Sequence, residues 1–368
     1  MKICHVITSL VYGGAERLLV NSLRIHAVDH DVTVIYLKGE PQLAAELPAN
    51  VAVIHVPFDR HCARTVRGHL ERIRPDVVHT QLGHADFIGQ WASRKLRVAR
   101  VCTMQNIYFK WDWRDRLIFA AYRVLFRRIV PNCHVLGISN SVTRHVEQRL
   151  GVPPDRSTMM YLAIPDVAID ADRAALRREL AIPDDAFCVL FVGRLRVQKS
   201  VPTLLRAAAI LRRDVPHLRV LLVGEGGEQP ALEALTDELG LRDVVEFRGV
   251  TATPERYFAA ADLFALPSVF EGFGLVVLEA FRAGLPVVAT RIEGPSELID
   301  DGENGYLVPT EDPDALAARI TELAADPALR ARIGAAGLAS YRGEFGIEQY
   351  AQRLDALYQR LVAAEGAA

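Results

Sequence analysis

The sequence predicts an α/β protein made of two Rossmann-like domains in tandem, each a doubly wound parallel sheet. Three observations support this. The 368 residues exceed what one hydrophobic core ordinarily holds. Short apolar runs alternate with segments of helical spacing, which is typical of parallel strands buried on both faces. The alternation breaks off around residues 164–183, where prolines interrupt it, and then begins again.

The expected elements follow this alternation. In the first half we expect strands at 3–9, 32–37, 51–56, 77–80, 100–103 and 135–139, with helices at 15–26, 65–73 and 85–95. In the second half we expect strands at 188–192, 219–223, 244–248, 263–266 and 286–289, with helices at 201–213, 230–239 and 275–283. A last amphipathic stretch predicts a helix at 347–364. The expected domains are therefore 1–168 and 169–346, with a C-terminal helix, 347–368, crossing back to the first domain.

Composition narrows the class of protein. Half of the residues are hydrophobic and 24% are charged, which is an ordinary globular composition. No apolar run approaches the roughly 18–20 residues that span a bilayer. The apolar start runs into Gly13 and Gly14 and is better interpreted as a first strand than as a signal peptide. The five cysteines form no CxxC pair, which favours a reducing, cytoplasmic location without disulfides.

Charge is unevenly distributed. Residues 1–168 hold 22 Lys and Arg against 14 Asp and Glu, whereas residues 169–368 hold 21 against 31. Ten of the eleven histidines also lie in the first part. This asymmetry predicts an anionic partner for the N-terminal domain, either a membrane surface or a phosphorylated acceptor; ordinary surface charge is the alternative. No recognition-helix motif accompanies the basic charge, so nucleic acid is not expected.

The segment from Glu271 to Glu279 is the strongest candidate for a ligand site. Glu271 is expected on a loop, Gly274 and Leu275 at a helix N-terminus, and Glu279 one turn inside that helix. A helix N-terminus preceded by glycines binds phosphate through free backbone N–H groups. The two carboxylates would suit hydroxyl groups on either side of the phosphate. The alternative is a glycine turn in front of a core helix.

Two further loops follow expected strands in this half. Arg194 and Lys199 could clamp a diphosphate and stabilise charge on a leaving group, although basic residues on loops are common. Glu225 lies in a Gly-Glu-Gly turn that is not a GxGxxG dinucleotide motif. In doubly wound sheets ligands lie beyond the carboxyl ends of the strands, so the site is expected between the two domains.

The N-terminal half offers weaker candidates. Gly13 and Gly14 join the first strand to the first helix and could let backbone approach a phosphate, or simply form a tight turn. His79 and His84 follow an apolar run and could bond hydroxyls or exchange protons, or be structural. The DxD pairs at 29–31, 170–172 and 312–314 are interpreted as solvated turns, so no metal site is expected.

Taken together, these residues resemble the retaining glycosyltransferase family 4 of the GT-B superfamily along nearly the whole chain. The resemblance is carried by the order and spacing of several short motifs: 13–17 (GGAER), 75–79 (PDVVH), 193–199 (GRLRVQK), 224–226 (GEG), 267–279 (PSVFEGFGLVVLE), 284–289 (GLPVVA), 294–297 (GPSE) and 304–308 (NGYLV).

The resemblance implies a donor site for a nucleotide-diphosphate sugar. Arg194 and Lys199 would hold the diphosphate, Glu271 the sugar hydroxyls and Glu279 the ribose. Backbone around Phe273, Gly274 and Leu275 would contact sugar and phosphate. The remaining implied donor contacts are Glu225, backbone near Val250 for the base, and Gly13 and Gly14 facing the diphosphate. The resemblance also implies no cofactor, no metal and a front-face reaction without a protein nucleophile.

The sequence departs from the family at three positions. Gln105 stands where members commonly have a histidine near the donor sugar, and glutamine cannot exchange a proton near neutral pH. Hydrogen bonding by Gln105 could suffice, or His79 or His84 could substitute, or activity could be impaired. Ser200 replaces a usual glycine after Lys199, and Pro295 replaces the second glycine of a pair. His84, Asn106 and Tyr108 are the expected acceptor-side residues.

The aromatic and basic segment 111–131 is expected to face the acceptor or a membrane, or else to be a buried face with snorkelling arginines. The sequence therefore predicts a retaining hexosyltransferase acting on a glycan or lipid-linked acceptor in polysaccharide or glycolipid assembly. It is expected in the cytoplasm, peripherally on the inner face of the membrane. The alternatives are a nucleotide-sugar-binding homologue without turnover and a sugar-nucleotide epimerase.

Overall fold

The computed structural model describes residues 1–11, 13–105, 123–124, 126–128, 132–167 and 172–367. The chain forms two compact units, one of Met1–Pro165 with Ile347–Ala368 and one of Asp166–Gly346. Each unit is built on one parallel sheet, and each is described by itself. The predicted fold class of two doubly wound parallel sheets is confirmed.

The N-terminal unit has strand order β3-β2-β1-β4-β5-β6-β7, with every neighbouring pair parallel. The strands are β1 (Lys2–Ser9), β2 (Asp31–Lys38), β3 (Ala52–His55), β4 (Val77–Gln81), β5 (Ala99–Met104), β6 (His134–Gly137) and β7 (Ser157–Met159). The helices whose bounds are described are α1 (Gly14–Asp29), η1 (Ala44–Glu46), α2 (Cys62–Ile73), α3 (His84–Ser93), α5 (Asn140–His145), η2 (Val146–Leu150), η3 (Pro154–Arg156) and α13 (Ile347–Ala367).

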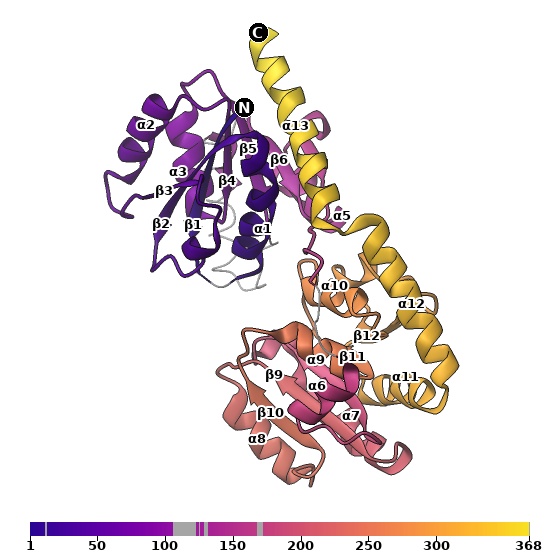
Figure 1. Cartoon of the computed structure of the whole chain (residues 1–368). Coiled ribbons are helices and arrows are strands. Elements are labelled where there is room, and N and C mark those ends of the chain that lie inside the picture. Colours follow the sequence, from indigo (N-terminus) through magenta and orange to yellow (C-terminus); the bar gives the residue numbers. More distant parts are fainter. Residues whose placement is uncertain (12, 106–122, 125, 129–131, 168–171, 368) are drawn as a thin grey trace. The chain divides into compact units, whose positions relative to one another are not determined.

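Helices cover both faces of this sheet (Figure 1). On one face Val6 and Val78 pack with residues of α2 and α3 in a fully buried cluster. On the other face Ile7 packs with Leu19 and Leu23 of α1. Because successive side chains of a strand point to opposite faces, this alternation buries the central strand β1 on both sides, as expected in a parallel sheet covered by helices.

Helix α13 returns from the end of the chain to the N-terminal unit and packs beside α1 (Figure 1). His26 of α1 bonds through Nε2 to the Ala351 carbonyl at 3.0 Å, and Nε2 of His30 lies 2.8 Å from Oδ1 of Asp355. Tyr358 is fully buried in this interface. The helix is thus a part of the N-terminal core.

The C-terminal unit has strand order β10-β9-β8-β11-β12-β13. The strands are β8 (Phe187–Val192), β9 (Leu218–Val223), β10 (Val245–Gly249), β11 (Leu263–Leu266), β12 (Val287–Thr290) and β13 (Tyr306–Val308). The helices are α6 (Arg173–Glu179), η4 (Val197–Lys199), α7 (Val201–Asp214), α8 (Gln229–Glu238), α9 (Pro254–Ala260), α10 (Leu275–Arg282), η5 (Pro295–Glu297), α11 (Pro313–Ala325) and α12 (Pro327–Glu344). This is the doubly wound order, which reverses direction between β8 and β11.

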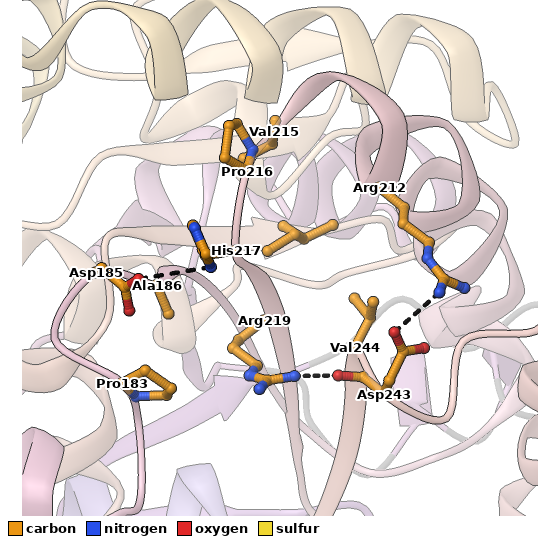
Figure 2. A pocket seen from close by; sticks show the side chains of 11 residues that line it. Pro183, Asp185, Ala186, Arg212, Val215, Pro216, His217, Arg219, Asp243 and Val244 are labelled. Atoms are coloured by element: carbon orange, nitrogen blue, oxygen red, sulfur yellow. Dashed lines mark hydrogen bonds and ion pairs between the residues drawn. The ribbon is translucent and has the colours of Figure 1, made fainter.

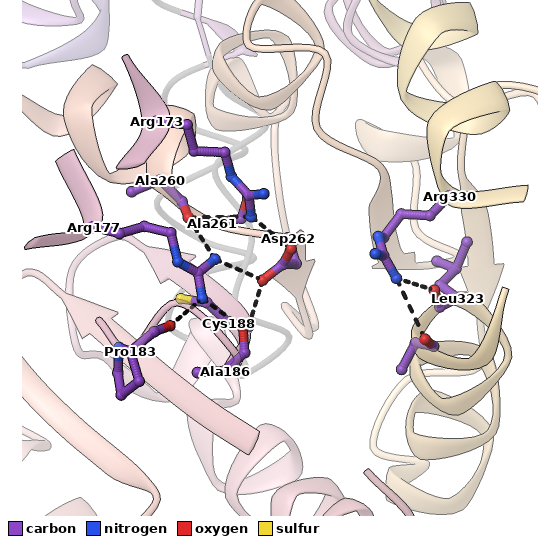
Figure 3. Close-up of polar contacts among 11 residues, drawn as sticks. Arg173, Arg177, Pro183, Ala186, Cys188, Ala260, Ala261, Asp262, Leu323 and Arg330 are labelled. Atoms are coloured by element: carbon purple, nitrogen blue, oxygen red, sulfur yellow. Dashed lines mark hydrogen bonds and ion pairs between the residues drawn. The ribbon is translucent and has the colours of Figure 1, made fainter. Parts of the chain in front are cut away.

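A buried ion pair joins α6 to this sheet (Figure 3). Nη1 of Arg177, a residue only 4% exposed, lies 3.2 Å from Oδ2 of Asp262, and the same oxygen accepts a 2.8 Å hydrogen bond from the Cys188 backbone N–H. The other guanidinium nitrogen donates to the carbonyls of Pro183 and Ala186 at 2.6 and 2.5 Å. The pair therefore links α6, the start of β8 and the segment before β11.

We predict that Asp262→Ala lowers the free energy of unfolding of the C-terminal unit by about 3–5 kcal/mol, because it leaves the Arg177 charge buried without its partner. Urea unfolding followed by far-UV circular dichroism measures this. Asp243→Ala, which removes the exposed Arg212–Asp243 pair, is the matched control and should cost less than about 1 kcal/mol. Equal losses in the two variants would contradict the assignment.

Candidate functional site

The carboxyl ends of the C-terminal strands carry a set of loops that are hydrogen-bonded to one another. The Val269 N–H after β11 donates to the Gln198 carbonyl after β8 at 2.9 Å. The Leu195 N–H donates to the Glu225 carbonyl after β9 at 2.9 Å, and the Gly224 N–H donates to Gly249 at 2.7 Å. The loops around the reversal of strand order thus form one surface, which is where α/β sheets bind ligands.

Lys199 and Glu271 meet at this reversal point. Nζ of Lys199 lies 2.5 Å from Oε1 of Glu271, and both side chains are mostly buried. The Ser268 hydroxyl donates to the same carboxylate oxygen at 2.6 Å, while Thr290 donates to the Ser268 carbonyl. No hydrogen bond from the described residues goes to Oε2 of Glu271. The pair therefore holds the β8 and β11 loops together and leaves one carboxylate oxygen for a ligand.

Helix α10 begins directly after this carboxylate. Its N-cap is Gly274, in the left-handed region at φ 96°, with no side chain to cap the first N–H groups. Gly294 packs against the loop, because a Cβ there would lie 2.8 Å from the Phe273 carbonyl oxygen and 2.9 Å from that of Glu271. An uncapped helix N-terminus of this kind attracts anions.

The other predicted donor residues line the same edge to different degrees. Arg194 and Glu225 are exposed in the loops after β8 and β9, and Val250 after β10 is 70% exposed. Phe273 is buried, with its ring centroid 6.4 Å from that of Phe345. Leu275 and Glu279, on the first two turns of α10, are half-buried. The structure brings all of them to the carboxyl edge of one sheet.

No individual role was predicted from the sequence for Ser268, Thr290 or Gly294, although Ser268 and Gly294 lie in the motifs at 267–279 and 294–297. Ser268 could have been found because it follows a predicted strand and precedes Glu271 by three residues. The structure also accommodates two residues that depart from the family motif, Ser200 and Pro295. Ser200 occupies the left-handed region at φ 45°, which favours glycine, and its hydroxyl lies 2.9 Å from that of Thr203. Pro295 begins the short helix η5, where its missing N–H is tolerated.

In the N-terminal unit His79 lies inside β4 rather than at an open edge. It is fully buried, with Nδ1 2.6 Å from the Tyr358 hydroxyl and Nε2 2.6 Å from that of Thr103. Burial lowers its pKa to about 3. Both ring nitrogens are engaged with the protein, and the imidazole is neutral near pH 7. This geometry favours a structural link between β4, β5 and α13 over acid–base chemistry.

The loop after β1 carries a carboxylate of its own. Glu16, at the third residue of α1, is 7% exposed and accepts a 3.0 Å hydrogen bond from Ser9. Its carboxylate covers Gly13, since a Cβ on Gly13 would lie 2.3 Å from Glu16 Oε2. A diphosphate approaching Gly13 and Gly14 would therefore meet a negative charge unless Glu16 moved.

The remaining acceptor-side candidates are only partly described. His84 begins α3, with Nε2 3.3 Å from Nζ of Lys38 and its ring 4.9 Å from that of Phe58. Gln105 directly follows β5 and is half-buried. Asn106, Tyr108 and most of segment 111–131 lie outside the described residues.

Two aspartates of the DxD pairs cap helices. Asp172 caps α6 and Asp312 caps α11, each accepting a backbone N–H. Among the described residues no cluster of His, Cys, Asp and Glu has the arrangement of a metal site. Within the same residues, no helix combines the length and apolarity that crossing a bilayer would need. The five cysteines are buried and unpaired.

A separate concavity of about 330 Å³ lies at the opposite edge of the C-terminal sheet, where β8, β9 and β10 begin (Figure 2). Its charged groups already contact each other. Arg212 pairs with Asp243 at 2.9 Å, His217 lies 3.5 Å from Asp185, and Arg219 donates to the Asp243 carbonyl. It lies at the amino ends of the strands, so the carboxyl edge remains the candidate site.

Known protein families match most of the chain. Residues 12–166 match the family model described as Glycosyltransferase Family 4, and residues 172–339 match that of Glycosyl transferases group 1. D-inositol 3-phosphate glycosyltransferase of Thermobispora bispora is 34% identical over 303 residues, which are 77% of this chain and 70% of that protein. Lipopolysaccharide core biosynthesis glycosyltransferase LpsD of Rhizobium meliloti is 38% identical over 187 residues, 51% of this chain and 53% of LpsD.

Solved structures agree in fold. The crystal structure of Anabaena HepE in complex with UDP has a TM-score of 0.86 at 23% identity, covering 98% of this chain and 100% of that one. Its complex with UDP-glucose gives a TM-score of 0.84 over the same share of both chains. The predicted GT-B fold is confirmed.

We predict that the N-terminal unit loses stability in acid. Burial lowers the pKa of His79 to about 3 and lowers the pKa values of His5 and His26 from 6.5. The unfolded chain therefore binds protons that the folded chain excludes, and the free energy of unfolding falls as pH drops from about 6.5 towards 3. Asp86 has the opposite sign, because burial raises its pKa from 3.8 to about 7 and the folded state binds the extra proton in that interval.

The three tryptophans all lie in residues 1–165, so urea unfolding followed by their fluorescence reports on this unit. As pH falls from 7.5 to 4.5, the free energy of unfolding of the wild-type protein should decrease. In Asp86→Asn it should decrease more steeply, because asparagine cannot take up the proton that Asp86 binds in the folded state. A stability independent of pH in both proteins would contradict the burial of neutral histidines.

Proposed function

Because this chain belongs to glycosyltransferase family 4, we propose that it moves a sugar from a nucleotide-diphosphate sugar to a glycan or lipid-linked saccharide, with retention at the anomeric carbon. The observation that carries the proposal is the Lys199–Glu271 pair in front of the uncapped α10 N-terminus. A cation and free backbone N–H groups suit a diphosphate, and a carboxylate with one open oxygen suits sugar hydroxyls.

The donor would lie on the C-terminal unit. Lys199 and Arg194 would hold the diphosphate together with the backbone of Gly274 and Leu275. Oε2 of Glu271 would accept from a sugar hydroxyl while Oε1 keeps its contacts with Lys199 and Ser268. The UDP and UDP-glucose complexes of HepE, a protein of the same fold, support a nucleotide sugar as the donor. Glu279 would bind the ribose and backbone near Val250 the base.

Catalysis would rest on positioning and electrostatics. As the bond between the anomeric carbon and the phosphate oxygen breaks, negative charge develops on the diphosphate, and Lys199, Arg194 and the helix N-terminus stabilise it. The departing phosphate would take the proton of the acceptor hydroxyl on the same face, so that the configuration is retained without a protein nucleophile. We propose that the reaction needs no metal ion, since these groups supply the positive charge.

The acceptor would meet the N-terminal unit near an anionic membrane surface. The excess of Lys and Arg in this half supports the proposal. So does Trp91, whose ring is flanked by the guanidinium groups of Arg67 and Arg94 at 4.8 and 4.4 Å. The name of the relative LpsD points to lipopolysaccharide core assembly in that protein, and we place the present chain in cell-surface polysaccharide or glycolipid synthesis.

The first test is donor binding and turnover. A panel of UDP-, GDP- and ADP-glucose is measured by calorimetry and by nucleotide release, with and without EDTA. Glu271→Gln should lower the turnover of the preferred donor by about tenfold or more, because a charge-assisted hydrogen bond to the sugar is lost. NMR should show product with the donor's anomeric configuration.

Asp243→Asn, at the opposite edge of the sheet, is the matched control and should behave as wild type. If no donor binds, or if Glu271→Gln turns over as fast as wild type, the site assignment fails. If a donor binds but is never transferred or hydrolysed, the chain binds nucleotide sugars without catalysis.

The second test concerns the membrane. The protein should co-sediment with vesicles of phosphatidylcholine containing phosphatidylglycerol and remain in the supernatant with phosphatidylcholine alone, because basic groups bind anionic headgroups. Added salt should release it, since the attraction is screened. The double variant Arg67→Glu/Arg94→Glu should bind less, and Arg212→Glu on the other unit should not. Sedimentation that ignores anionic lipid content would exclude this arrangement.

A further inference from the structure

We propose that mild acid releases helix α13 from the N-terminal unit while the sheet beneath it stays folded. The inference goes beyond the proposed function, because it concerns how the chain is held together and applies whether or not a sugar is transferred. It rests on a group of histidines at the contact with α13, which come from four other elements: His5 on β1, His26 and His30 on α1, His79 on β4 and His134 on β6.

Two of these histidines are hydrogen-bonded to α13. Nδ1 of His79 lies 2.6 Å from the Tyr358 hydroxyl, and Nε2 of His26 lies 3.0 Å from the Ala351 carbonyl oxygen. The Tyr358 ring also packs near both imidazoles, with centroid distances of 5.8 Å to His79 and 6.2 Å to His26. All three rings belong to residues that are at most 4% exposed, so the docked helix helps to exclude water from the two histidines.

The docked state favours neutral imidazoles. Because the Ala351 carbonyl accepts from Nε2 of His26, a second proton would go to Nδ1, which is buried without a hydrogen-bond partner in the described parts of the chain. Both nitrogens of His5 are likewise buried without such a partner, and its ring lies 5.2 Å from that of His79. Burial lowers the pKa of His79 to about 3. Protonation of these rings is therefore costly as long as α13 covers them.

His134 responds to a charge on α13 as well as to burial. Burial, and then the guanidinium group of Arg360, lower the pKa of His134 to about 4, although Asp155 favours the charged form. Its Nε2 lies 2.8 Å from the Thr158 hydroxyl. Release of α13 would carry Arg360 away, so His134 would also take up a proton more readily.

One carboxylate of α13 reduces this response. Oδ1 of Asp355 lies 2.8 Å from Nε2 of His30, and Asp355 also favours the charged form of His26. The pKa of His79, in contrast, is set by burial and then by the neighbouring His26. The other titratable groups on this part of α13 do not change charge in mild acid, because phenol and guanidinium groups titrate far above neutral pH: Tyr350, Arg353 and Tyr358.

The size of the effect follows from the pKa of His79. When α13 leaves, the imidazole reaches water and its pKa returns towards the ordinary value of about 6.5. Below that pH, each unit shifts the release equilibrium about tenfold until the docked histidine itself takes up a proton near pH 3. At pH 4.5 His79 favours release about 100-fold more than at pH 7.5, and His134 adds a factor of similar size. Docking of α13 therefore weakens as the pH falls below about 6.5.

The opposite face of the sheet responds to acid in the other direction. Asp86 on α3 is 2% exposed, and burial raises its pKa to about 7, so between pH 3.8 and 7 the folded unit binds a proton that the unfolded chain does not. The neighbouring Cys102 and Cys133 remain thiols, since burial raises their pKa values. Release of α13 keeps the proton of Asp86, because α3 packs with Val6 and Val78 on the other face. Acid therefore favours release of α13 over unfolding of the whole unit.

The chain connectivity also permits such a release. Helix α13 is separated from the rest of its unit by residues 166–346, which form the C-terminal unit. Its departure breaks side-chain contacts but interrupts no strand of the N-terminal sheet, and local openings of this kind need less free energy than global unfolding. Docked α13 adds a second connection between the two units, at residues 346–347, and its release leaves the one at 165–166.

Hydrogen exchange of the full chain, followed by mass spectrometry at pH 7.5 and 4.5, tests the inference. The protection factor, which is the intrinsic exchange rate at each pH divided by the observed rate, should fall about 100-fold or more for peptides of α13 and clearly less for peptides of β1 and β4. In His79→Gln, which cannot take up a proton, about 100-fold of the fall in α13 should vanish. His26→Gln should reduce the fall in the same direction. His69→Gln on α2, at the opposite face of the unit, is the matched control and should behave as wild type.

Asp86→Asn tests the response of the sheet. Because asparagine binds no extra proton in the folded state, the protection of β1 and β4 should fall together with that of α13 in this variant. A parallel loss of protection in the wild type would show that acid unfolds the whole unit, and would exclude the inference. So would an α13 that stays protected at pH 4.5, or histidine variants that respond to acid as the wild type does. Circular dichroism at pH 7.5 shows which variants fold; if His79→Gln does not, His26→Gln and the wild-type comparison still decide.

Discussion

The reversal of strand order beside the first strand of each sheet is the constraint on which the rest of this molecule depends. Parallel strands buried on both faces can present side chains to a ligand only at their ends. Where the connections wind to opposite sides, the loops separate and leave room. In the C-terminal unit that place lies between β8 and β11, and it holds Lys199 and Glu271. In the N-terminal unit it lies between β1 and β4, and it holds Gln81.

The ion pair at the C-terminal reversal point determines the charge that a donor would meet there. In the free protein the cation and the carboxylate neutralise each other, so the pair itself carries no net charge before any donor arrives. In the proposed function a diphosphate would bring net negative charge to Lys199, while Oε1 of Glu271 keeps its contact with Lys199 and Oε2 faces the sugar hydroxyl groups. Arg194, exposed in the loop after β8, would add the positive charge that the pair alone lacks.

Much of the fold followed from periodicity, and the failures have physical causes. The strand expected at 263–266 is β11, whereas β7 and β13 were missed because three residues show no alternation that a reader could detect. The loops that carry Arg194, Lys199 and Glu271 were placed correctly after strands. The contact between Lys199 and Glu271 was not predicted, because a contact between residues 72 positions apart depends on strand order.

The histidines and glutamines of the N-terminal unit show that residue type alone does not predict the environment of a side chain. His79 was singled out because histidine is chemically versatile, yet burial engages both of its nitrogens with the protein. Gln81 was given no role, although it lies two residues further along the same strand and the same face. Residue type alone could not show that both side chains are buried in the sheet.

The return of α13 to the N-terminal unit also bears on how the protein is made. His79 and Tyr358 are 279 residues apart in the chain, yet they are hydrogen-bonded in one core. At ordinary rates of synthesis the partner of His79 emerges from the ribosome roughly 15–60 s after the strand that carries it. Until then the face of β4 and β5 that α13 covers stays open to water and to other nascent chains. The first unit to be synthesised is therefore the last to be completed.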